Sequence, residues 1–439
     1  MIEEKGLMAR PPELSDQSVT SVRVVYSDLH GVTRGKDVPI GEFDRAADHG
    51  LAFCSAIMGT DLRHTPVVGS EAGYPDLIAK PDLTTLTLLP WEPGVACCIA
   101  DLEAVSGTSA TPADPRGAVR KAVAGFEELG YAPIVGPELE FFLCVPDPSA
   151  PNGIRRYVDH LSMVYTVGPQ ADPAGIVRRL SETLSELGLE TFAANHEFGN
   201  SQYEINLREA PALVAADRAF LLKSAVKDVA ALNGLLATFM GRPFNDQGGS
   251  GFHIHVSVNR NGENAFAEVT GELRRFSAGI LAHAPALTAF LNPTVNAYKR
   301  LVPDSLAPTH ANWGWDNRTT FIRVPQERGA ATRVEVRVGD GSANPYLAIA
   351  ATLLAGLHGL RDGLALPDAV EGDAYTQEQP NRLPASLTDA LDALEADNYL
   401  RDAIGAPIVD TFLAMKRFEA ERHRQWVSDW ERDEYLHHL

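Results

Sequence analysis

The chain has 439 residues, of which 45% are hydrophobic and 22% charged, with a formal net charge of -20. This length exceeds that of a typical compact domain, so one large and one smaller domain are expected. The acidic balance argues against nucleic acid or an anionic membrane as a partner, because both require a positive surface. The sequence contains neither a secretory signal nor an apolar run long enough to span a membrane, and its cysteines form no CxxC pair. These features predict a soluble, cytoplasmic protein.

The first part of the chain predicts a short tail and a small mixed domain. Residues 1–15 are predicted to be a flexible tail, and residues 16–106 a domain of strands with one helix. Strand-like segments begin at Val19, between Lys36 and Ile40, and at 83–91 and 96–104. The helix is expected at 41–49, ended by Gly50, which tolerates the backbone conformation at a helix C-terminus.

A stretch of small residues and proline at 106–115 predicts the linker between two domains. After it, Asp114 and Pro115 are typical of the start of a capped helix. The second domain, residues 112–439, alternates strands with long helices. These helices are predicted at 173–188, 211–236, 269–291, 344–363, 386–396 and from Ile408 to about Leu436.

Several predicted strands carry polar side chains on one face and apolar side chains on the other. Because strand side chains alternate between faces, residues two apart point the same way. The polar sets are His253, His255 and Ser257; Arg333, Glu335 and Arg337; Glu138 and Glu140; and Glu197 with, on a strand, Glu204 and Asn206.

Such alternation is also what any half-buried antiparallel strand shows when its polar face is in water. This polar set is chemically coherent, however, because it combines carboxylates, imidazoles and arginines. Neighbouring carboxylates repel one another unless a cation lies between them, and oxygen ligands with one imidazole favour magnesium or manganese over zinc. Arginines facing the same cavity are suited to phosphate and carboxylate groups. The sequence therefore predicts a metal–nucleotide site that transfers a phosphoryl group.

Six segments in one order resemble type-I glutamine synthetases, and the resemblance runs from about residue 18 to the end of the chain. They are GPELEFFL, NHEFGNSQYEINL, GGSGFHIHVSV, NPTVNAYKRLVP, NRTTFIRVP and TRVEVRVGDGSANPYLAIAATLLAGL. The resemblance implies an α+β fold, with a small N-terminal β-grasp domain and an α/β catalytic domain whose antiparallel strands form a funnel-shaped barrel. It also implies a homododecamer of two stacked hexameric rings, with active sites shared between neighbours.

The resemblance also implies a role for each residue of the site. The first metal site falls on Glu140, Glu197 and Glu204, and the second on Glu138, His253 and Glu335. ATP contacts fall on His255, Ser257, Arg318, Arg323 and Arg333, and glutamate contacts on the Gly249 backbone, Arg300 and Arg337. Arg300, Arg318, Glu138 and Glu140 are expected to be catalytic. In the implied reaction, ATP phosphorylates the side-chain carboxylate of glutamate, and an amine then displaces phosphate.

Two departures from the family concern the amine. Leu306 stands where true glutamine synthetases place a glutamate over the site, and the AFCSAI segment lacks the family's aspartate. Ammonium needs fixed negative charge, whereas an apolar mouth suits an alkyl amine. An amine pocket is therefore expected at Leu306, Cys54 and Ser55. The predicted product is a γ-glutamyl amide of ethanolamine, a polyamine or another alkyl amine.

Three alternatives remain open at this stage. The chain is a true glutamine synthetase if another acid, such as Asp61, takes over the ammonium site. It uses a different amino acid if Gly248, which replaces an asparagine of the family, changes that subsite. It is a non-catalytic structural or regulatory relative if the predicted ligands serve no reaction.

Overall fold

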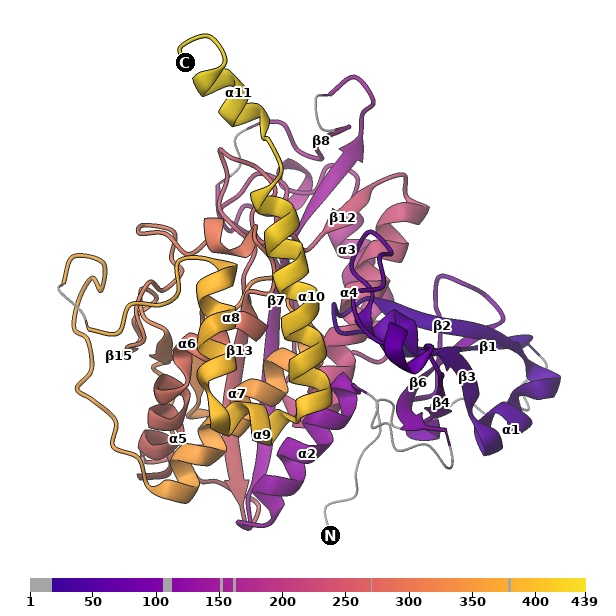
Figure 1. The fold of residues 1–439 in the computed structure, drawn as a ribbon, viewed down its shortest axis with the longest axis horizontal. Coiled ribbons are helices and arrows are strands. Elements are labelled where there is room, and N and C mark those ends of the chain that lie inside the picture. Colours follow the sequence, from indigo (N-terminus) through magenta and orange to yellow (C-terminus); the bar gives the residue numbers. More distant parts are fainter. Residues whose placement is uncertain (1–17, 106–112, 151–152, 161–162, 270, 378–379) are drawn as a thin grey trace.

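The computed structural model describes residues 18–105, 113–150, 153–160, 163–269, 271–377 and 380–439. Within these residues the strands form two sheets, each with its own helices (Figure 1). The predicted tail at 1–15 and most of the predicted linker lie outside the described residues.

The smaller sheet contains the strands before the linker, in the order β2-β1-β6-β4-β3, with β5 paired to β6. Strand β1 pairs with β6 in parallel and with β2 in the antiparallel sense. Helix α1 ends at Gly50, whose φ is positive, as the glycine there predicts. The elements are β1 Ser21–Ser27, β2 Thr33–Pro39, α1 Ile40–His49, β3 Leu51–Cys54, β4 Asp76–Pro81, β5 Thr87–Leu88 and β6 Val95–Ala104.

The larger sheet is centred on β7, a 15-residue strand that pairs with β13 and β10, both antiparallel. Its main order is β15-β16-β17-β13-β7-β10-β9, with β8, β11 and β12 paired to β7 and β14 to β13. The strands are β7 Ala132–Pro146, β8 Ile154–Arg156, β9 Thr191–His196, β10 Gln202–Leu207, β11 Ala210–Pro211, β12 Leu236–Thr238, β13 Phe252–Arg260, β14 Glu263–Asn264, β15 Trp313–Trp315, β16 Ile322–Val324 and β17 Val334–Val336.

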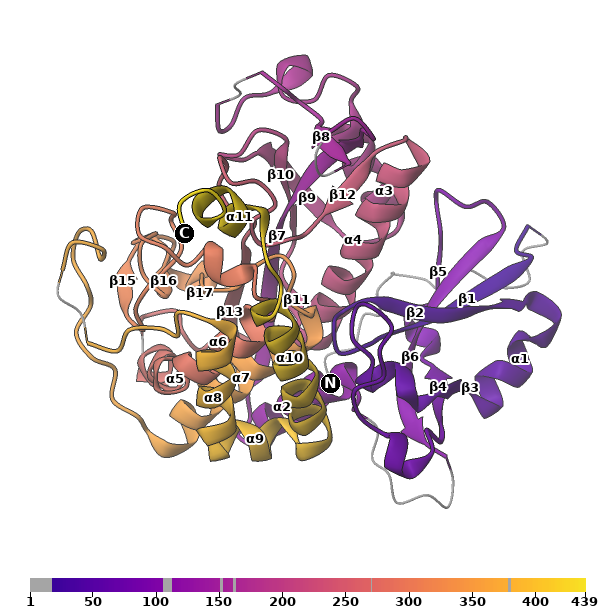
Figure 2. The ribbon, with the colours of Figure 1, turned by 45° about the horizontal axis from the view of Figure 1, so that its top comes forward.

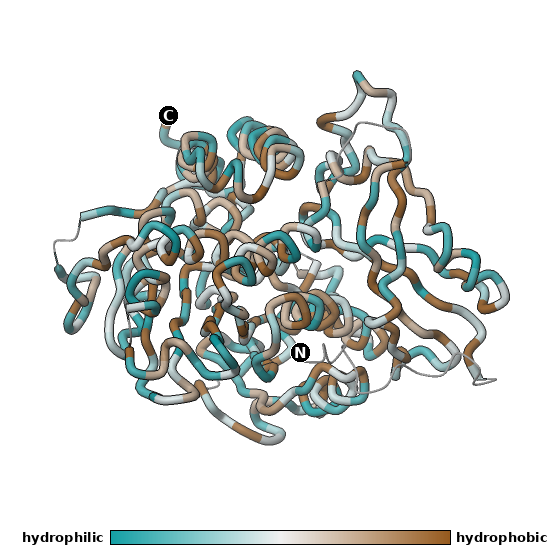
Figure 3. The backbone as a smooth tube through the Cα atoms, turned by 90° about the horizontal axis from the view of Figure 1, so that it is seen from below, coloured by the Kyte–Doolittle hydropathy of each residue, from teal (hydrophilic) through white to brown (hydrophobic). Residues whose placement is uncertain are grey.

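Helices cover one side of the larger sheet, and most residues of α7 are buried (Figures 1 and 2). Hydrophobic residues run along the strands of both parts, while the outer helices and loops are more hydrophilic (Figure 3). The helices are α2 Pro115–Glu127, α3 Ile176–Glu186, α4 Ala212–Leu232, α5 Gly271–Ala282, α6 Ala284–Leu291, α7 Pro345–Asp362, α8 Leu387–Ala396, α9 Asn398–Ile404, α10 Ala406–Arg424 and α11 Asp429–Tyr435.

Three predicted elements differ in the structure. The helix at 269–291 is two helices, because Pro285 in the first turn of α6 has no N–H to continue α5. The C-terminal helix is also interrupted, and Ser428 caps the new helix α11 with a capping box. The strand-like run at 83–91 begins instead as a 3-10 turn at Leu83–Thr85, where the side chain of Asp82 accepts a hydrogen bond from the Thr84 backbone.

The two parts of the chain are tied by a buried arginine at the start of α2. The Arg116 guanidinium contacts Asp82 at 2.8 Å and Asp101 at 2.6 Å in the small domain, and Asp217 on α4 at 2.8 Å. Asp114 caps α2 by accepting from the Arg116 backbone N–H, as the sequence predicts. These contacts fix the small sheet against the helices of the larger domain.

Candidate active site

The register of the larger sheet brings the predicted ligands onto neighbouring strands. His253 on β13 lies opposite Glu138 on β7, and Glu204 on β10 lies opposite Glu140. Residues opposite each other in an antiparallel pair have Cβ atoms about 4.5–5.5 Å apart, so their side chains interact directly. The polar faces inferred from alternation therefore meet on one face of the sheet.

Glu138 lies between the two histidines. Its carboxylate is 3.0 Å from His255 Nε2 and 3.4 Å from His253 Nδ1. Although burial opposes ionisation of Glu138, His255 and His253 hold the pKa of this carboxyl well below its usual range. The His253 Nε2 atom is buried without a hydrogen-bond partner. That orphaned nitrogen is available as a metal ligand.

Glu335 on β17 completes a cluster of potential ligands. Ligand atoms of Glu138, His255 and Glu335 lie within 4.8 Å of one another, and His253 Nδ1 is 3.7 Å from Glu335. The tightest trio thus includes His255, which the sequence assigned to the nucleotide, while His253 lies beside it. Although Glu335 is buried, Arg337 and both histidines lower its pKa to about 2.

The other predicted metal ligands, Glu140, Glu197 and Glu204, form a second group of carboxylates. Among the described residues, no neighbouring cation fully offsets their negative charge. Burial, and then the charge of Glu140, raise the pKa of Glu197 to about 7. Burial, followed by Glu138, Glu140 and Glu197, raises the pKa of Glu204 well above its usual range. Buried carboxylates in this arrangement fit a divalent cation, which would favour their ionised forms. The donor set therefore fits the metal ions that the sequence predicts.

Polar neighbours orient these carboxylates. Gln202 Nε2 donates to Glu140 at 2.7 Å, and the Gly251 backbone N–H donates to the same oxygen at 2.8 Å. Asn195 donates to Glu197, and Asn206 to Glu204. Gln202 and Asn195 are absent from the sequence-based set, although Gln202 shares the strand face of Glu204 and could have been found by that alternation.

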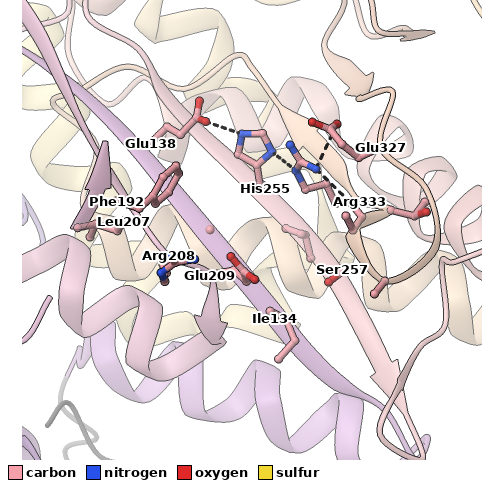
Figure 4. Close-up of a pocket in the computed structure, with 15 residues that line it drawn as sticks. Ile134, Glu138, Phe192, Leu207, Arg208, Glu209, His255, Ser257, Glu327 and Arg333 are labelled. Atoms are coloured by element: carbon pink, nitrogen blue, oxygen red, sulfur yellow. Dashed lines mark hydrogen bonds and ion pairs between the residues drawn. The ribbon is translucent and has the colours of Figure 1, made fainter. Parts of the chain in front are cut away.

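A cavity of about 350 Å³ lies beside the cluster, and its walls contain three of the predicted nucleotide residues, His255, Ser257 and Arg333 (Figure 4). Arg333 Nε donates to His255 Nδ1 at 3.1 Å, while the opposite ring nitrogen faces Glu138. These two contacts orient the His255 ring at the boundary between the cavity and the carboxylates. Phe192 and Arg208 also line the cavity and were not predicted.

The other two predicted nucleotide arginines lie elsewhere. Arg323 contacts Asp316 and Glu335, each at 2.6 Å, so the structure places it at the Glu335 side of the cluster. Arg318 is exposed and is not part of the cavity wall. Their contact with ATP stays a prediction.

Two of the predicted glutamate residues, Gly249 and Arg300, lie next to Glu140, and the third, Arg337, lies next to Glu335. Arg300 is buried and donates to the Val338 carbonyl at 3.0 Å, and its side chain packs over Gly249. A Cβ at Gly249 would lie 2.5 Å from the Gly241 carbonyl oxygen, so only glycine fits this close approach. Arg337 contacts Glu335 and donates to the Leu306 carbonyl at 3.3 Å.

The three residues of the predicted amine pocket are not together in one chain. Leu306 lies beside Arg337 and is 37% exposed. Cys54 and Ser55 lie at the end of β3 in the small domain, on the far side of α4 from β15–β17 (Figures 1 and 2). A pocket formed by all three requires residues from two copies of the chain.

Family comparison defines the class of protein. The model of the glutamine synthetase catalytic domain matches residues 112–435. The chain therefore belongs to the glutamine synthetase family, whose members are ligases that form carbon–nitrogen bonds and use ATP, glutamate and divalent metal ions. No helix among the described residues is long and apolar enough to cross a membrane.

The proteins to which this chain is similar carry different enzyme names. The chain is 37% identical to the glutamine synthetase of Methanocaldococcus jannaschii and 34% identical to that of Halobacterium salinarum, covering 95% and 97% of this chain and 95% of each relative. Its fold is similar to that of GmaS, a gamma-glutamylmethylamide synthetase, solved as an ADP complex, with a TM-score of 0.86 and 33% identity over 96% of this chain and 98% of that one.

Proposed function

We propose that this ligase joins the side-chain carboxyl of L-glutamate to an organic amine, such as ethanolamine, a polyamine or another alkyl amine. The product is a γ-glutamyl amide, formed through γ-glutamyl phosphate. The supporting observation is Leu306, an apolar and 37% exposed side chain where the resemblance places the family's glutamate, next to Arg337 of the proposed glutamate site. The similarity to GmaS supports the same conclusion.

Asp61 does not supply the missing charge in this structure. Its side chain is 2% exposed, and one carboxylate oxygen accepts from the backbone N–H groups of Arg63 at 2.9 Å and Thr65 at 2.8 Å. The other oxygen pairs with Arg422 on α10. This acid holds a turn and a helix together, so the observation disfavours the alternative in which Asp61 binds ammonium.

The proposed reaction assigns a task to each side of the site. His255, Ser257 and Arg333 hold the nucleotide, while Arg300 and Arg337 hold glutamate's α-carboxylate through guanidinium N–H groups left over from their backbone contacts. Magnesium or manganese, held by Glu140, Glu197 and Glu204 and by Glu138, His253 and Glu335, would neutralise charge on the transferring phosphoryl group. The terminal phosphoryl group of ATP is transferred to the side-chain carboxylate of glutamate, and ADP is released. The amine nitrogen then forms the amide bond as the carbon–oxygen bond to phosphate breaks.

An amine panel tests this proposal. Purified enzyme is assayed with glutamate, ATP and magnesium, and phosphate release is measured while only the amine varies. At least one of methylamine, ethanolamine and putrescine is expected to give a higher kcat/KM than ammonium. A higher kcat/KM for ammonium than for each organic amine would favour the second candidate, a true glutamine synthetase, which the names of the relatives support.

Restoring the family acids should move the preference toward ammonium. Leu306→Glu combined with Cys54→Asp is expected to raise the ratio of ammonium to organic-amine turnover by about tenfold, the effect of about 1.4 kcal/mol of differential binding. Leu306→Glu alone should change the ratio less, because one carboxylate restores only part of the fixed negative charge that ammonium needs. Leu306→Gln with Cys54→Asn is the uncharged control, and an equal shift in the control would show that charge is not the cause.

We also propose that the chain forms a homo-oligomer, with a dodecamer of two stacked rings as the expected form. Around the projecting helix α11, Trp426 and Trp430 are each 63% exposed and Leu436 is 70% exposed (Figure 1). Exposed apolar groups in such number indicate a protein interface. Deleting residues 426–439 should reduce the particle mass measured by light scattering, and an unchanged mass would contradict this role of the segment.

The remaining finer assignments stay predictions. They are the β-grasp class of the small domain, the funnel-shaped barrel of the larger sheet, the domain bounds 16–106 and 112–439, and a cytoplasmic location. The non-catalytic alternative is disfavoured, because all six proposed metal positions carry competent ligand atoms, five of them on paired strands of one sheet and Glu197 directly after β9.

A further inference from the structure

A second cavity of about 350 Å³ lies where the small domain meets α4, β12 and α10. Its wall shares no residue with the cavity beside the carboxylate cluster. Figure 1 shows α4 and α10 close together on the side of the catalytic domain that faces the small domain. The charged or titratable residues that line this cavity are all basic: His30, Lys223, Lys227 and Lys416.

Two of these lysines lack an acidic partner. Lys223 is 5% exposed, and its Nζ donates to the carbonyls of Gly341 at 2.9 Å and Ala343 at 2.8 Å. Neither Lys223 nor Lys227, one helical turn further along α4, has a carboxylate within 4.0 Å among the described residues. Burial, and then repulsion from Lys227, lower the pKa of Lys223 to about 7. An anion in the cavity would relieve this repulsion.

The other two basic residues form the opposite wall. Lys416 on α10 is 1% exposed, and its Nζ lies 3.2 Å from His30 Nδ1 and 3.0 Å from Glu419. His30 Nε2 in turn contacts the Thr60 carbonyl at 3.1 Å. Glu419 thus offsets the charge of Lys416, whereas neither lysine on α4 has such a direct ion pair among the described residues.

Asp28, two residues before His30 of the cavity wall, is already engaged in other contacts. Asp28 accepts from the backbone N–H groups of His30 and Val32, each at 2.9 Å, and pairs with Arg34 at 2.8 Å. Its carboxylate is therefore engaged by the turn after β1. Lys223 and Lys227 therefore have no carboxylate in direct contact, although the charges of Asp340 and Asp28 favour the protonated form of Lys223, and those of Asp228 and Asp28 the protonated form of Lys227.

We propose that this cavity binds a small dianion, a phosphate-bearing or dicarboxylate metabolite, between the two domains. Its volume is within the range of about 300–1,000 Å³ typical of small-molecule sites. Lysine ammonium groups suit both kinds of anion as point charges. Groups from both domains would contact the occupant, so binding also strengthens the contact between them.

The cavity is linked to the segment that carries Arg337. Lys223 holds the carbonyls of Gly341 and Ala343, and the Gly341 N–H donates to the Ser250 carbonyl at 3.0 Å, one residue from Gly249. An anion that attracts Lys223 competes with these carbonyls. The occupant therefore acts as an effector of glutamate binding, a consequence that rests on the proposed function, whereas the binding itself does not.

Calorimetric titration of the full-length protein, without substrates and at constant ionic strength, tests the site. Inorganic phosphate and succinate are the two probes, and they distinguish a phosphate-bearing from a dicarboxylate ligand. Wild type is expected to show a site that Lys227→Gln weakens at least about tenfold, equivalent to about 1.4 kcal/mol. Lys121→Gln, which removes an exposed lysine on α2, should bind as wild type. Equal affinities in all three proteins, or no binding of either probe, would overturn the proposal.

Two further readouts locate the anion and its effect. Wild-type crystals soaked in selenate should show an anomalous peak between Lys223 and Lys227 that Lys227→Gln crystals lack. A peak only among the active-site arginines would overturn the assignment. The bound probe should change the KM for glutamate in wild type and Lys121→Gln but not in Lys227→Gln, and an unchanged KM in wild type would overturn the effector role.

Discussion

Glu140→Gln is expected to lower kcat at least about hundredfold while changing the unfolding temperature little. The glutamine oxygen can still accept the hydrogen bonds from Gln202 and Gly251, so the local structure is kept. The other carboxylate oxygen lies beside Gly251, as does His253 Nε2, and its replacement by an amide nitrogen removes an anionic ligand.

Two measurements separate metal binding from other causes. The magnesium dependence of the initial rate should move to higher concentration, and calorimetry without nucleotide should show weaker manganese binding. Glu128→Gln, at an exposed ion pair with Arg361, is the matched control and should behave as wild type. Activity of Glu140→Gln within about twofold of wild type, with unchanged metal dependence, would contradict the assignment of Glu140.

Arg337→Lys is expected to raise the KM for glutamate by about ten- to hundredfold, the loss of about 1.5–3 kcal/mol that accompanies a charge-assisted hydrogen bond. Lysine keeps the positive charge next to Glu335 but loses the planar fork that matches a carboxylate. The KM for ATP should change little, because Arg337 does not line the cavity proposed for the nucleotide.

Steady-state kinetics with each substrate varied in turn check this result. Arg361→Lys, on the exposed end of α7, is a control for the general effect of the substitution. A shifted ATP dependence with an unchanged glutamate dependence would mean that the two subsites are exchanged.

The alternation of side chains in strands predicted the main grouping of polar residues. It placed Glu138 with Glu140 and His253 with His255, because it depends only on local backbone geometry. The pairing of His253 with Glu138 and of Glu204 with Glu140 then follows from sheet register, which the structure supplies. Gln202 obeys the same alternation and was missed, because an uncharged amide gives no charge signal.

Long-range pairing explains what the sequence could not predict. The partner of Asp61 is Arg422, 361 residues away, so the sequence left this acid available for a substrate. Lys223 and Lys227 on α4 likewise line one cavity with Lys416 on α10 only in the folded chain, because the two helices are far apart in the sequence. Helix ends were predicted where Asp114, Gly50 or Pro115 gave a local signal, whereas Pro285 inside an apolar run was overlooked.

A direct competition measures the central claim, the preference for an organic amine. Wild-type enzyme receives glutamate, ATP and magnesium together with equal concentrations of ammonium and the best amine of the panel. The products are quantified by mass spectrometry at early times, so the product ratio equals the ratio of the two kcat/KM values. We expect more of the γ-glutamyl amide of the organic amine than of glutamine. An excess of glutamine would contradict the proposed preference for an organic amine.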